Sequence, residues 1–211
     1  MSELLWQKRI RNYAGLLGAL LPWISLLGAF LVNIFTPLGS KFWGDLSISA
    51  TYYVTPALAG ILTTASVVLM CYDGYDLQDN VVTTISGVFG IMIVLFPCNC
   101  SLTPAHTGFF QLPAKASSLI HCSSAVIFFC LLAYNSIFLF TKKRGEKTNK
   151  KKLRNKVYIA CGIGMLSAMI LMPLPIKFPA KTWFVEMIAL TFFGIGWLVK
   201  GGAFKFLNDK E

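Results

Sequence analysis

The feature that most constrains this chain is the apolar run of residues 117–141, which holds one histidine, His121, and no formal charge. At 25 residues it exceeds the ~20 apolar residues needed to cross a ~30 Å hydrocarbon core. The run leads directly into residues 142–156, which carry nine of the nineteen Lys and Arg residues. Because such clusters stay on the cytoplasmic side, the junction predicts a transmembrane helix that ends in the cytoplasm.

Five further apolar runs are predicted to cross the membrane. The six predicted spans are residues 13–36, 49–72, 81–97, 117–141, 157–172 and 183–204. The composition agrees, since 13% of residues are charged whereas soluble domains carry ~25%. We therefore expect one all-α membrane domain over residues 1–211, with six transmembrane helices.

The distribution of basic residues predicts the orientation of these helices. With six spans, fifteen Lys and Arg residues fall in the segments assigned to the cytoplasm and four in the outer loops. This bias is the one that the positive-inside rule describes. We therefore expect both termini, and the basic loop of residues 142–156, in the cytoplasm.

The basic loop also bears on the partners of the chain. No aromatic residue lies between its Lys and Arg residues, as a stacking platform for nucleic-acid bases would require. We therefore expect no nucleic acid, and predict contact with anionic lipid headgroups of the bilayer instead. A homo-oligomer is a further candidate partner.

Residues 73–80 form a polar turn between two spans, on the same predicted side as the basic loop. Asp73, Asp76 and Asp79 are spaced by three residues, whereas a calcium-binding loop places carboxylates at alternate positions and ends on a Glu. Ion pairing with the basic loop is the simpler interpretation. The predicted cytoplasmic polar contacts are Asp73, Asp76, Asp79, Arg154, Asn155 and Lys200.

The six cysteines do not form a recognisable metal or disulfide framework. Cys122 can pair with Cys98 or Cys100 if the outer compartment is oxidising. A zinc site that adds His121 is the weaker alternative, because C-x-C is not the usual ligand spacing. We predict no metal site and no cofactor.

An ionisable residue inside a span is costly and marks a candidate functional site. His121 and Glu186 each lie about one turn below the outer end of a predicted span, and therefore share a depth. Helical spacing places other polar residues at the same level. The predicted outward-facing polar pocket consists of Ser49, Tyr52, Tyr53, Ser117, His121, Ser124 and Glu186.

Four interpretations of this pocket remain open. His121 and Glu186 can be a buried structural pair that fixes which helices pack together. They can instead form a proton-titrating gate for transport, since His changes charge near neutral pH. A membrane hydrolase would use Ser49 as nucleophile, His121 as base and Glu186 as orienter, although no GxSxG elbow surrounds Ser49. A lipid-binding or assembly role needs only the pocket and the basic inner surface.

Several motifs resemble those of a small family of bacterial membrane proteins with six spans and no assigned activity. The motifs are SISATYY, YDGYDLQDN and LFPC in the first half, and HCSSAVIFFCLLAYNSIFLFTK, RNKVYIACG and EMIALTFFGIGWLVKGG in the second. The resemblance covers residues 47–202 and implies a bacterial inner (plasma) membrane protein. The motif positions that it implies are Ser49, Tyr52, Asp79, His121, Arg154, Asn155, Glu186 and Lys200. Family members tend to carry His where this chain has Val54, which weakens any multi-histidine metal site.

A more distant likeness is to the ceramidase and adiponectin-receptor superfamily of membrane metal hydrolases. Those proteins carry Ser, Asp and His on their spans and end with HxxxH on the last one. This chain has Glu186 on its last predicted span and no HxxxH. The likeness therefore supports only the alternative of a membrane hydrolase that acts on a lipid or an amide.

Overall fold

Seven α-helices make up most of the chain in the computed structural model, which describes residues 3–142 and 148–209. The helices are α1 Glu3–Phe35, α2 Gly39–Gly44, α3 Ala57–Met70, α4 Leu77–Leu95, α5 Ala114–Tyr134, α6 Asn149–Leu171 and α7 Lys181–Gly201. The predicted all-helical character is thereby confirmed. A single two-stranded hairpin in the described part pairs β1 (His106–Thr107) with β2 (Leu112–Pro113), antiparallel.

Three short helical segments extend or connect these helices. The 3₁₀ helix η1 (Ser49–Tyr53) precedes α3, and η3 (Lys205–Leu207) follows α7. The π-helix η2 (Asn135–Leu139) continues α5. Such π-helical turns are rare inside α-helices.

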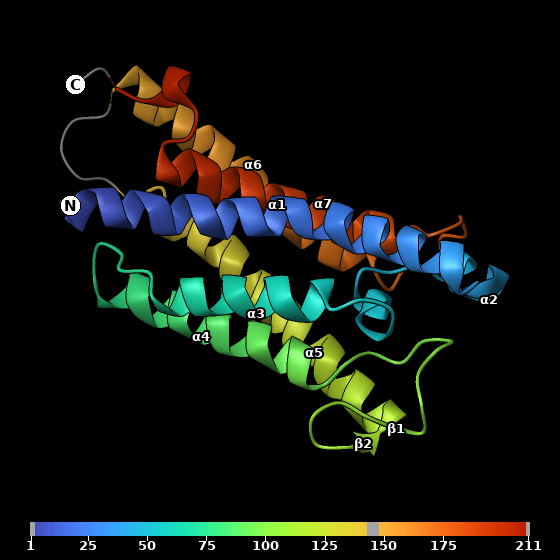
Figure 1. The fold of residues 1–211 in the computed structure, drawn as a ribbon. Coiled ribbons are helices and arrows are strands. Elements are labelled where there is room, and N and C mark those ends of the chain that lie inside the picture. The colour runs from blue at the N-terminus through green and yellow to red at the C-terminus, as the bar shows by residue number, and fades with distance from the viewer. Residues whose placement is uncertain (1–2, 143–147, 210–211) are drawn as a thin grey trace.

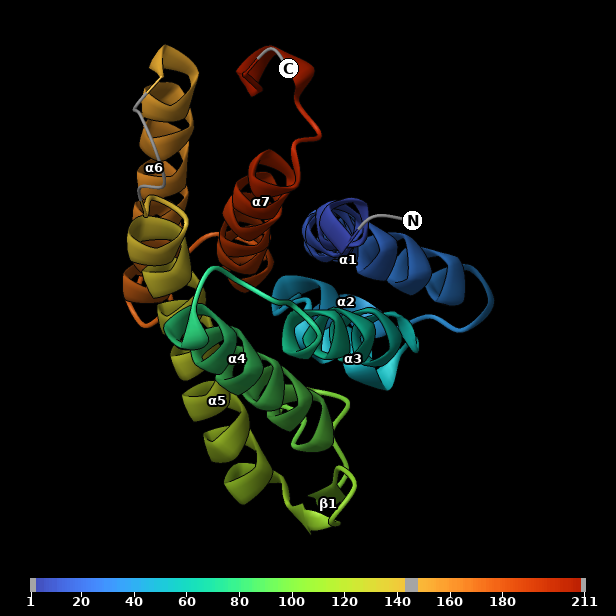
Figure 2. The ribbon, with the colours of Figure 1, turned by 90° about the vertical axis from the view of Figure 1, so that its left-hand side faces the viewer.

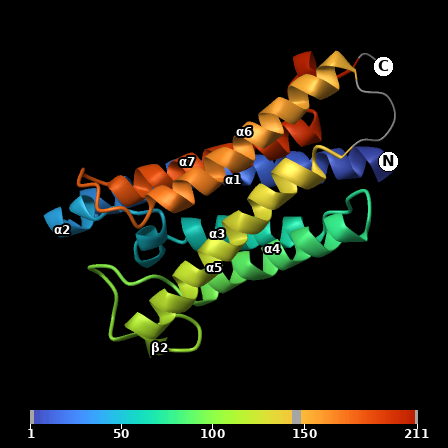
Figure 3. The same cartoon turned by 180° about the vertical axis from the view of Figure 1, so that it is seen from behind.

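The six long helices form a closed ring in the order of the sequence. Each of α1, α3, α4, α5 and α6 packs against the next, and α7 packs back against α1. Figure 2 looks along this ring from one end. The start of α1 and the segment η3 after α7 lie at that end, called here the termini end, whereas α2 and the β1–β2 hairpin lie at the opposite hairpin end (Figure 1, Figure 3).

Small residues allow α1 and α7 to close the ring. A Cβ atom on Gly15 of α1 would lie 2.8 Å from the carbonyl oxygen of Gly194 on α7. One turn further along α1, a Cβ atom on Gly18 would collide with the ring of Phe193. The two helix backbones therefore approach more closely than larger residues would permit.

Four helices among the described residues are long and apolar enough to cross a membrane. They are Leu5–Phe35, Leu77–Leu95, Ala114–Leu139 and Lys181–Gly201. The apolar helix α3 has 14 residues, and α6 begins with a strongly basic segment. A membrane-spanning architecture is therefore supported, while the count of six spans and their orientation stay predictions.

The predicted second span, residues 49–72, is wrong as one continuous helix. The structure has η1, a break at residues 54–56 and then the shorter α3. Pro56 explains the break, because it disfavours helical geometry at the preceding Thr55 and offers no N–H to a helix that would continue through it. Instead Pro56 sits at the N-cap of α3.

Other predicted boundaries also differ from the structure, two of them by eight residues or more. The helix α1 begins at Glu3, ten residues before the predicted start of the first span. Residues 142–156 are not a loop throughout, since α6 begins at Asn149 and is capped by the Thr148 hydroxyl, which accepts from the N–H of Lys151. Residues 143–147 of the predicted basic loop lie outside the described part. The capping side chain satisfies an otherwise unpaired N–H, which allows a lysine-rich segment to start a helix.

Candidate functional site

Three of the predicted pocket residues meet at the hairpin end of the ring. Ser49 lies in η1, His121 in α5 and Glu186 in α7. The Ser49 hydroxyl donates to Glu186 Oε1 over 2.7 Å, and its Oγ lies 3.1 Å from His121 Nε2. We call this arrangement the Glu186–Ser49–His121 chain, because the serine oxygen joins the other two side chains.

The position of Glu186 is fixed by η1 as well as by its own helix. The backbone N–H of Ile48 donates to Glu186 Oε2, so that the carboxylate accepts from two successive residues. The Ser47 hydroxyl accepts from the N–H of Ala50 and stabilises the same turn. The N–H of Trp183 donates to the Leu46 carbonyl and fastens the start of α7 to this segment. Glu186 therefore links η1 to α7.

The orientation of the His121 ring follows from its partners. Its Nδ1 lies 3.0 Å from the carbonyl oxygens of both Ile93 and Phe96, at the end of α4. Carbonyl oxygens only accept hydrogen bonds, so Nδ1 carries a hydrogen. In a neutral ring, Nε2 is then an acceptor that faces Ser49.

The hydrogen bonds of the Glu186–Ser49–His121 chain need one proton more than the serine hydroxyl supplies. If Ser49 donates to the Glu186 carboxylate, then Nε2 must be protonated to donate to Ser49. If Ser49 donates to Nε2, the Glu186 carboxyl must be protonated to donate to Ser49. Both contacts are satisfied only when one additional proton resides on His121 or on Glu186. A shift of both hydrogens along Ser49 interconverts the two states.

The Glu186–Ser49–His121 chain is largely shielded from solvent. His121 is 4% exposed, and Ser49 and Glu186 are half-buried. His121 and Glu186 are therefore close, as their shared depth predicts, but they are joined through Ser49.

The other predicted pocket residues contact or stabilise neighbouring segments. The Tyr53 hydroxyl donates to the Cys98 carbonyl over 2.8 Å, and the Ser117 hydroxyl donates to the Pro97 carbonyl over 2.8 Å. Both bonds hold the loop that follows α4. Tyr52 packs edge-to-face on Tyr53, and Ser124 is buried on α5.

At the termini end, residues 73–80 meet the start of the basic segment. The predicted turn is shorter than expected, because α4 already begins at Leu77. Lys142 Nζ lies 2.9 Å from Asp76 and 2.6 Å from Asp79. The hydrogen bond from Lys142, helped by the N–H of Asp79, lowers the pKa of Asp76. Asp76 also caps α4, and Asp73 accepts from the Asn80 side chain over 2.7 Å.

The remaining predicted cytoplasmic residues surround α6 and the C-terminal tail. Arg154 pairs with Asp209 over 2.8 Å and donates to the Leu207 carbonyl. Hydrogen bonds from Thr148 and Arg154 lower the pKa of Asp209. The buried Asn155 Oδ1 has no hydrogen-bond partner within residues 3–142 and 148–209. Lys200 Nζ lies 4.3 Å from the centre of the Tyr75 ring.

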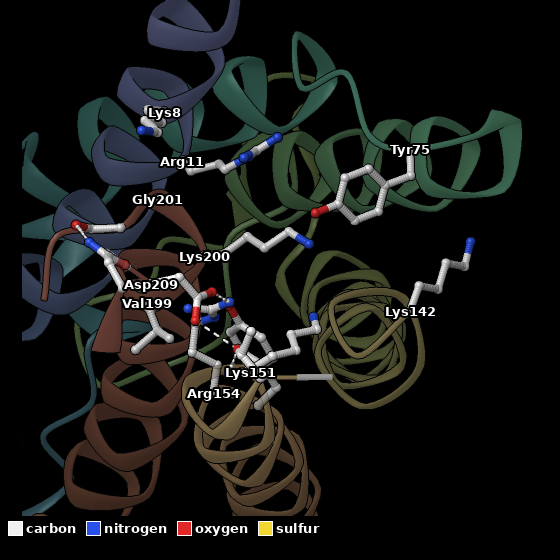
Figure 4. A pocket seen from close by; sticks show the side chains of 14 residues that line it. Lys8, Arg11, Tyr75, Lys142, Lys151, Arg154, Val199, Lys200, Gly201 and Asp209 are labelled. Atoms are coloured by element: carbon white, nitrogen blue, oxygen red, sulfur yellow. Dashed lines mark hydrogen bonds and ion pairs between the residues drawn. The ribbon is translucent and has the colours of Figure 1, made fainter. Parts of the chain in front are cut away.

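A feature absent from the sequence-based predictions is a cavity of about 380 Å³ at the termini end. Figure 4 shows basic side chains that converge on it from α1, α6 and α7. Pairs spaced by three residues, Lys8 with Arg11 and Lys151 with Arg154, carried a usable signal, because that spacing puts both on one helix face. Sequence reasoning treated these residues as markers of orientation, as part of a loop that contacts lipid headgroups and, for Arg154, as a motif position, but not as the lining of one cavity. We call this feature the basic cavity.

A second cavity, of about 550 Å³, is a largely apolar groove between α1 and α3 that includes Leu17, Gly28 and Ile61. Neither cavity is lined by Ser49, His121 or Glu186. The six cysteines are free thiols. Among the described residues, no three His, Cys, Asp or Glu side chains are grouped to hold a metal ion.

Comparison with known protein families, curated proteins and solved structures finds no match to this chain.

Proposed function

We propose that this chain is a six-span inner-membrane protein of bacterial type, with both termini in the cytoplasm. In this orientation the Glu186–Ser49–His121 chain lies near the outer surface. It holds a proton and couples that proton to the binding or passage of a small molecule, a lipid or an ion. The charge bias of the sequence supports the orientation, and the ring of six helices supports the span count.

The observation that carries the proposal is the placement of Ser49 Oγ between Glu186 Oε1 and His121 Nε2. Three polar groups on three separate elements form one continuous hydrogen-bonded path. A histidine changes charge near neutral pH, and a carboxyl beside it can exchange the proton through the hydroxyl. Because η1 and α7 both depend on Glu186, a change in the position of the proton alters the contact between those elements.

The alternative of a membrane hydrolase has less support from this geometry. In a catalytic triad the acid orients the histidine, and the histidine activates the serine. Here Glu186 bonds to Ser49 itself, while backbone carbonyls orient His121. A hydrolase needs the histidine between the acid and the serine, whereas here the serine lies between the acid and the histidine. Family membership, as implied by the motif resemblance, stays part of the proposal.

Proton movement in liposomes tests the proposal directly. Purified protein is reconstituted with an internal pH dye, and a potassium diffusion potential drives proton entry. We expect uptake above that of empty liposomes, and a fall of about tenfold or more in Glu186→Gln and Ser49→Ala, because each breaks the path. Ser49→Thr, which keeps a hydroxyl, should retain more uptake than Ser49→Ala. Ser86→Ala is the matched control, because this buried serine bonds only within its own helix.

Two results would separate the competing interpretations. If the wild type carries no more protons than empty liposomes, and the variants only lose thermal stability, the transport proposal fails. The Glu186–Ser49–His121 chain then only stabilises the packing of its helices. If a fluorophosphonate probe labels Ser49 in the wild type but not in His121→Ala, the hydrolase alternative replaces it.

A further inference from the structure

The basic cavity combines an ample volume with an excess of positive charge. Its volume of about 380 Å³ falls within the range of small-molecule sites. Among the residues that the structure describes, six cationic side chains line it, against one carboxylate, that of Asp209. The six are Lys8, Arg11, Lys142, Lys151, Arg154 and Lys200.

Only two of these cations have acidic partners in the part of the chain that the structure describes. Lys142 pairs with Asp76 and Asp79, and Arg154 pairs with Asp209. The other four come from three different helices, with Lys8 and Arg11 on α1, Lys151 on α6 and Lys200 on α7. These four charges around one space repel each other, and an anion in the cavity would relieve that repulsion.

Lys200 is the most informative of the four, because it sits in the last turn of the apolar helix α7. Its Nζ lies 4.3 Å from the centre of the Tyr75 ring and 4.8 Å from that of Phe140, and it is half-buried. Within the described residues, no oxygen accepts a hydrogen bond from this ammonium group. An ionisable side chain in such a helix normally faces a partner or a water-filled cavity. Lys200 lines the basic cavity and adds a positive charge that pairs with no carboxylate of the described residues.

Arg11 also carries a hydrogen-bond donor that lacks an acceptor among the described residues. Its Nε is buried and has no hydrogen-bond partner in the described part of the chain. Its guanidinium carbon lies 5.4 Å from the centre of the Tyr72 ring. Figure 4 shows Arg11, Lys151 and Lys200 extending into the same space from α1, α6 and α7. Guanidinium and ammonium donors arranged in this way suit the several oxygens of a phosphate group.

We propose that the basic cavity binds a phosphate group, carried by an anionic phospholipid or by a free phosphorylated compound. Lys200, Arg11 and Lys151 supply the main contacts, while the Arg154–Asp209 pair forms one wall. A single phosphate would join α1, α6 and α7 at the termini end of the ring. The proposal is independent of the proton path, which lies at the hairpin end.

Thermal unfolding in a neutral detergent tests the proposal. The melting temperature is followed while pyrophosphate, or a short-chain phosphatidylglycerol, is added at constant ionic strength maintained with sodium chloride. Phosphatidylcholine is the lipid control. A ligand that binds only the folded state raises the melting temperature progressively as its concentration passes the dissociation constant. We expect such a rise with pyrophosphate, with phosphatidylglycerol or with both, and none with phosphatidylcholine.

Two variants locate the site and a third controls for general loss of charge. Lys200→Met and Arg11→Gln should weaken the response about tenfold or more in concentration, since each removes a charge-assisted contact. Lys115→Gln removes an exposed lysine at the hairpin end and should leave the response unchanged.

Each outcome assigns or removes the ligand. A response to pyrophosphate alone identifies a free phosphate compound, and a response to phosphatidylglycerol alone identifies a lipid headgroup. No wild-type response beyond that of chloride overturns the proposal, whether or not the variants fold. A response that persists equally in Lys200→Met and Arg11→Gln also overturns it, because the phosphate would then bind elsewhere.

Discussion

The polar side chains at the two ends of the helix ring differ in how completely they are paired. At the hairpin end, Glu186, Ser49 and His121 satisfy each other and the nearby backbone. At the termini end, the basic cavity gathers six cations around a single carboxylate within the described part of the chain. The hydrogen bonds at the hairpin end are complete when one additional proton is present. At the termini end, the described residues supply too few carboxylates to neutralise the cations.

This difference has a physical consequence for stability. Removing a member of a satisfied buried cluster leaves its partners without hydrogen bonds, which is costly. Removing one of several mutually repelling cations costs little and can be favourable in the absence of a ligand. Substitutions at the two ends should therefore differ in size and even in sign.

The largest effect is expected from Glu186→Ala. The change leaves the Ile48 N–H and the Ser49 hydroxyl without their acceptor, and we expect the free energy of unfolding to fall by about 2–5 kcal/mol. Denaturant unfolding in detergent measures it. Glu186→Gln keeps a carbonyl oxygen and should lose less. A loss below about 0.5 kcal/mol for Glu186→Ala, the scale of ordinary surface changes, would show that the hairpin end does not depend on this cluster.

The second-largest effect is expected at the contact between α1 and α7, which closes the ring of helices. Gly15→Leu places a side chain against the backbone of Gly194 and should lower the free energy of unfolding by about 1–3 kcal/mol through overpacking. Gly60→Leu is the matched control, because a Cβ atom there meets nothing within 4 Å. Equal melting temperatures for the two variants would contradict the close contact between α1 and α7.

A smaller effect should come from salt, and only at the termini end. Raising sodium chloride from about 0.01 M to about 0.15 M shortens the Debye length from ~30 Å to ~8 Å and screens the cations of the basic cavity. We expect the melting temperature to rise, and to rise less in a Lys8→Gln/Arg11→Gln double variant. If the double variant responds to salt as the wild type does, repulsion in the cavity is not what salt relieves.

The smallest effect is expected from the exposed pair of Asp76 with Lys142. The pKa of Asp76 is lowered in the folded chain, so the pair stabilises the fold above the ordinary carboxyl range and loses that contribution as the pH falls below about 4. Asp76→Asn keeps the N-cap of α4 while it removes the charge. The variant should melt slightly below the wild type at neutral pH, and the difference should shrink as the pH falls below about 4. A difference that persists in acid would assign it to the cap instead.

The sequence was sufficient for the helical class and for part of the candidate site. Long apolar runs predict helices because the backbone must satisfy itself in lipid, and the depth of His121 and Glu186 predicts their proximity. Ser49 also appeared among the expected residues. The Ser49 hydroxyl joins the side chains of His121 and Glu186 because η1 positions it between them. The segment η1 forms because Pro56 interrupts the expected helix. Hydrophobicity alone carries no information about that interruption.

The basic cavity was missed for a different reason. Its cations are far apart in the sequence, from Lys8 to Lys200, and each has a sufficient explanation as a marker of orientation. Only the packing of α7 against α1 and α6 brings them around one space. Tertiary contacts of this kind cannot be derived from the spacing of residues within single helices.

The central claim, that one proton is shared along the Glu186–Ser49–His121 chain, is tested most directly by nitrogen NMR of protein labelled only in its histidines. The chain has two histidines, and His106→Gln leaves His121 as the single signal. We predict that Nδ1 stays protonated from about pH 8 to about pH 5, that Nε2 responds to pH, and that Glu186→Gln changes this response. An unprotonated Nδ1, or a response identical in the wild type and Glu186→Gln, would contradict the account.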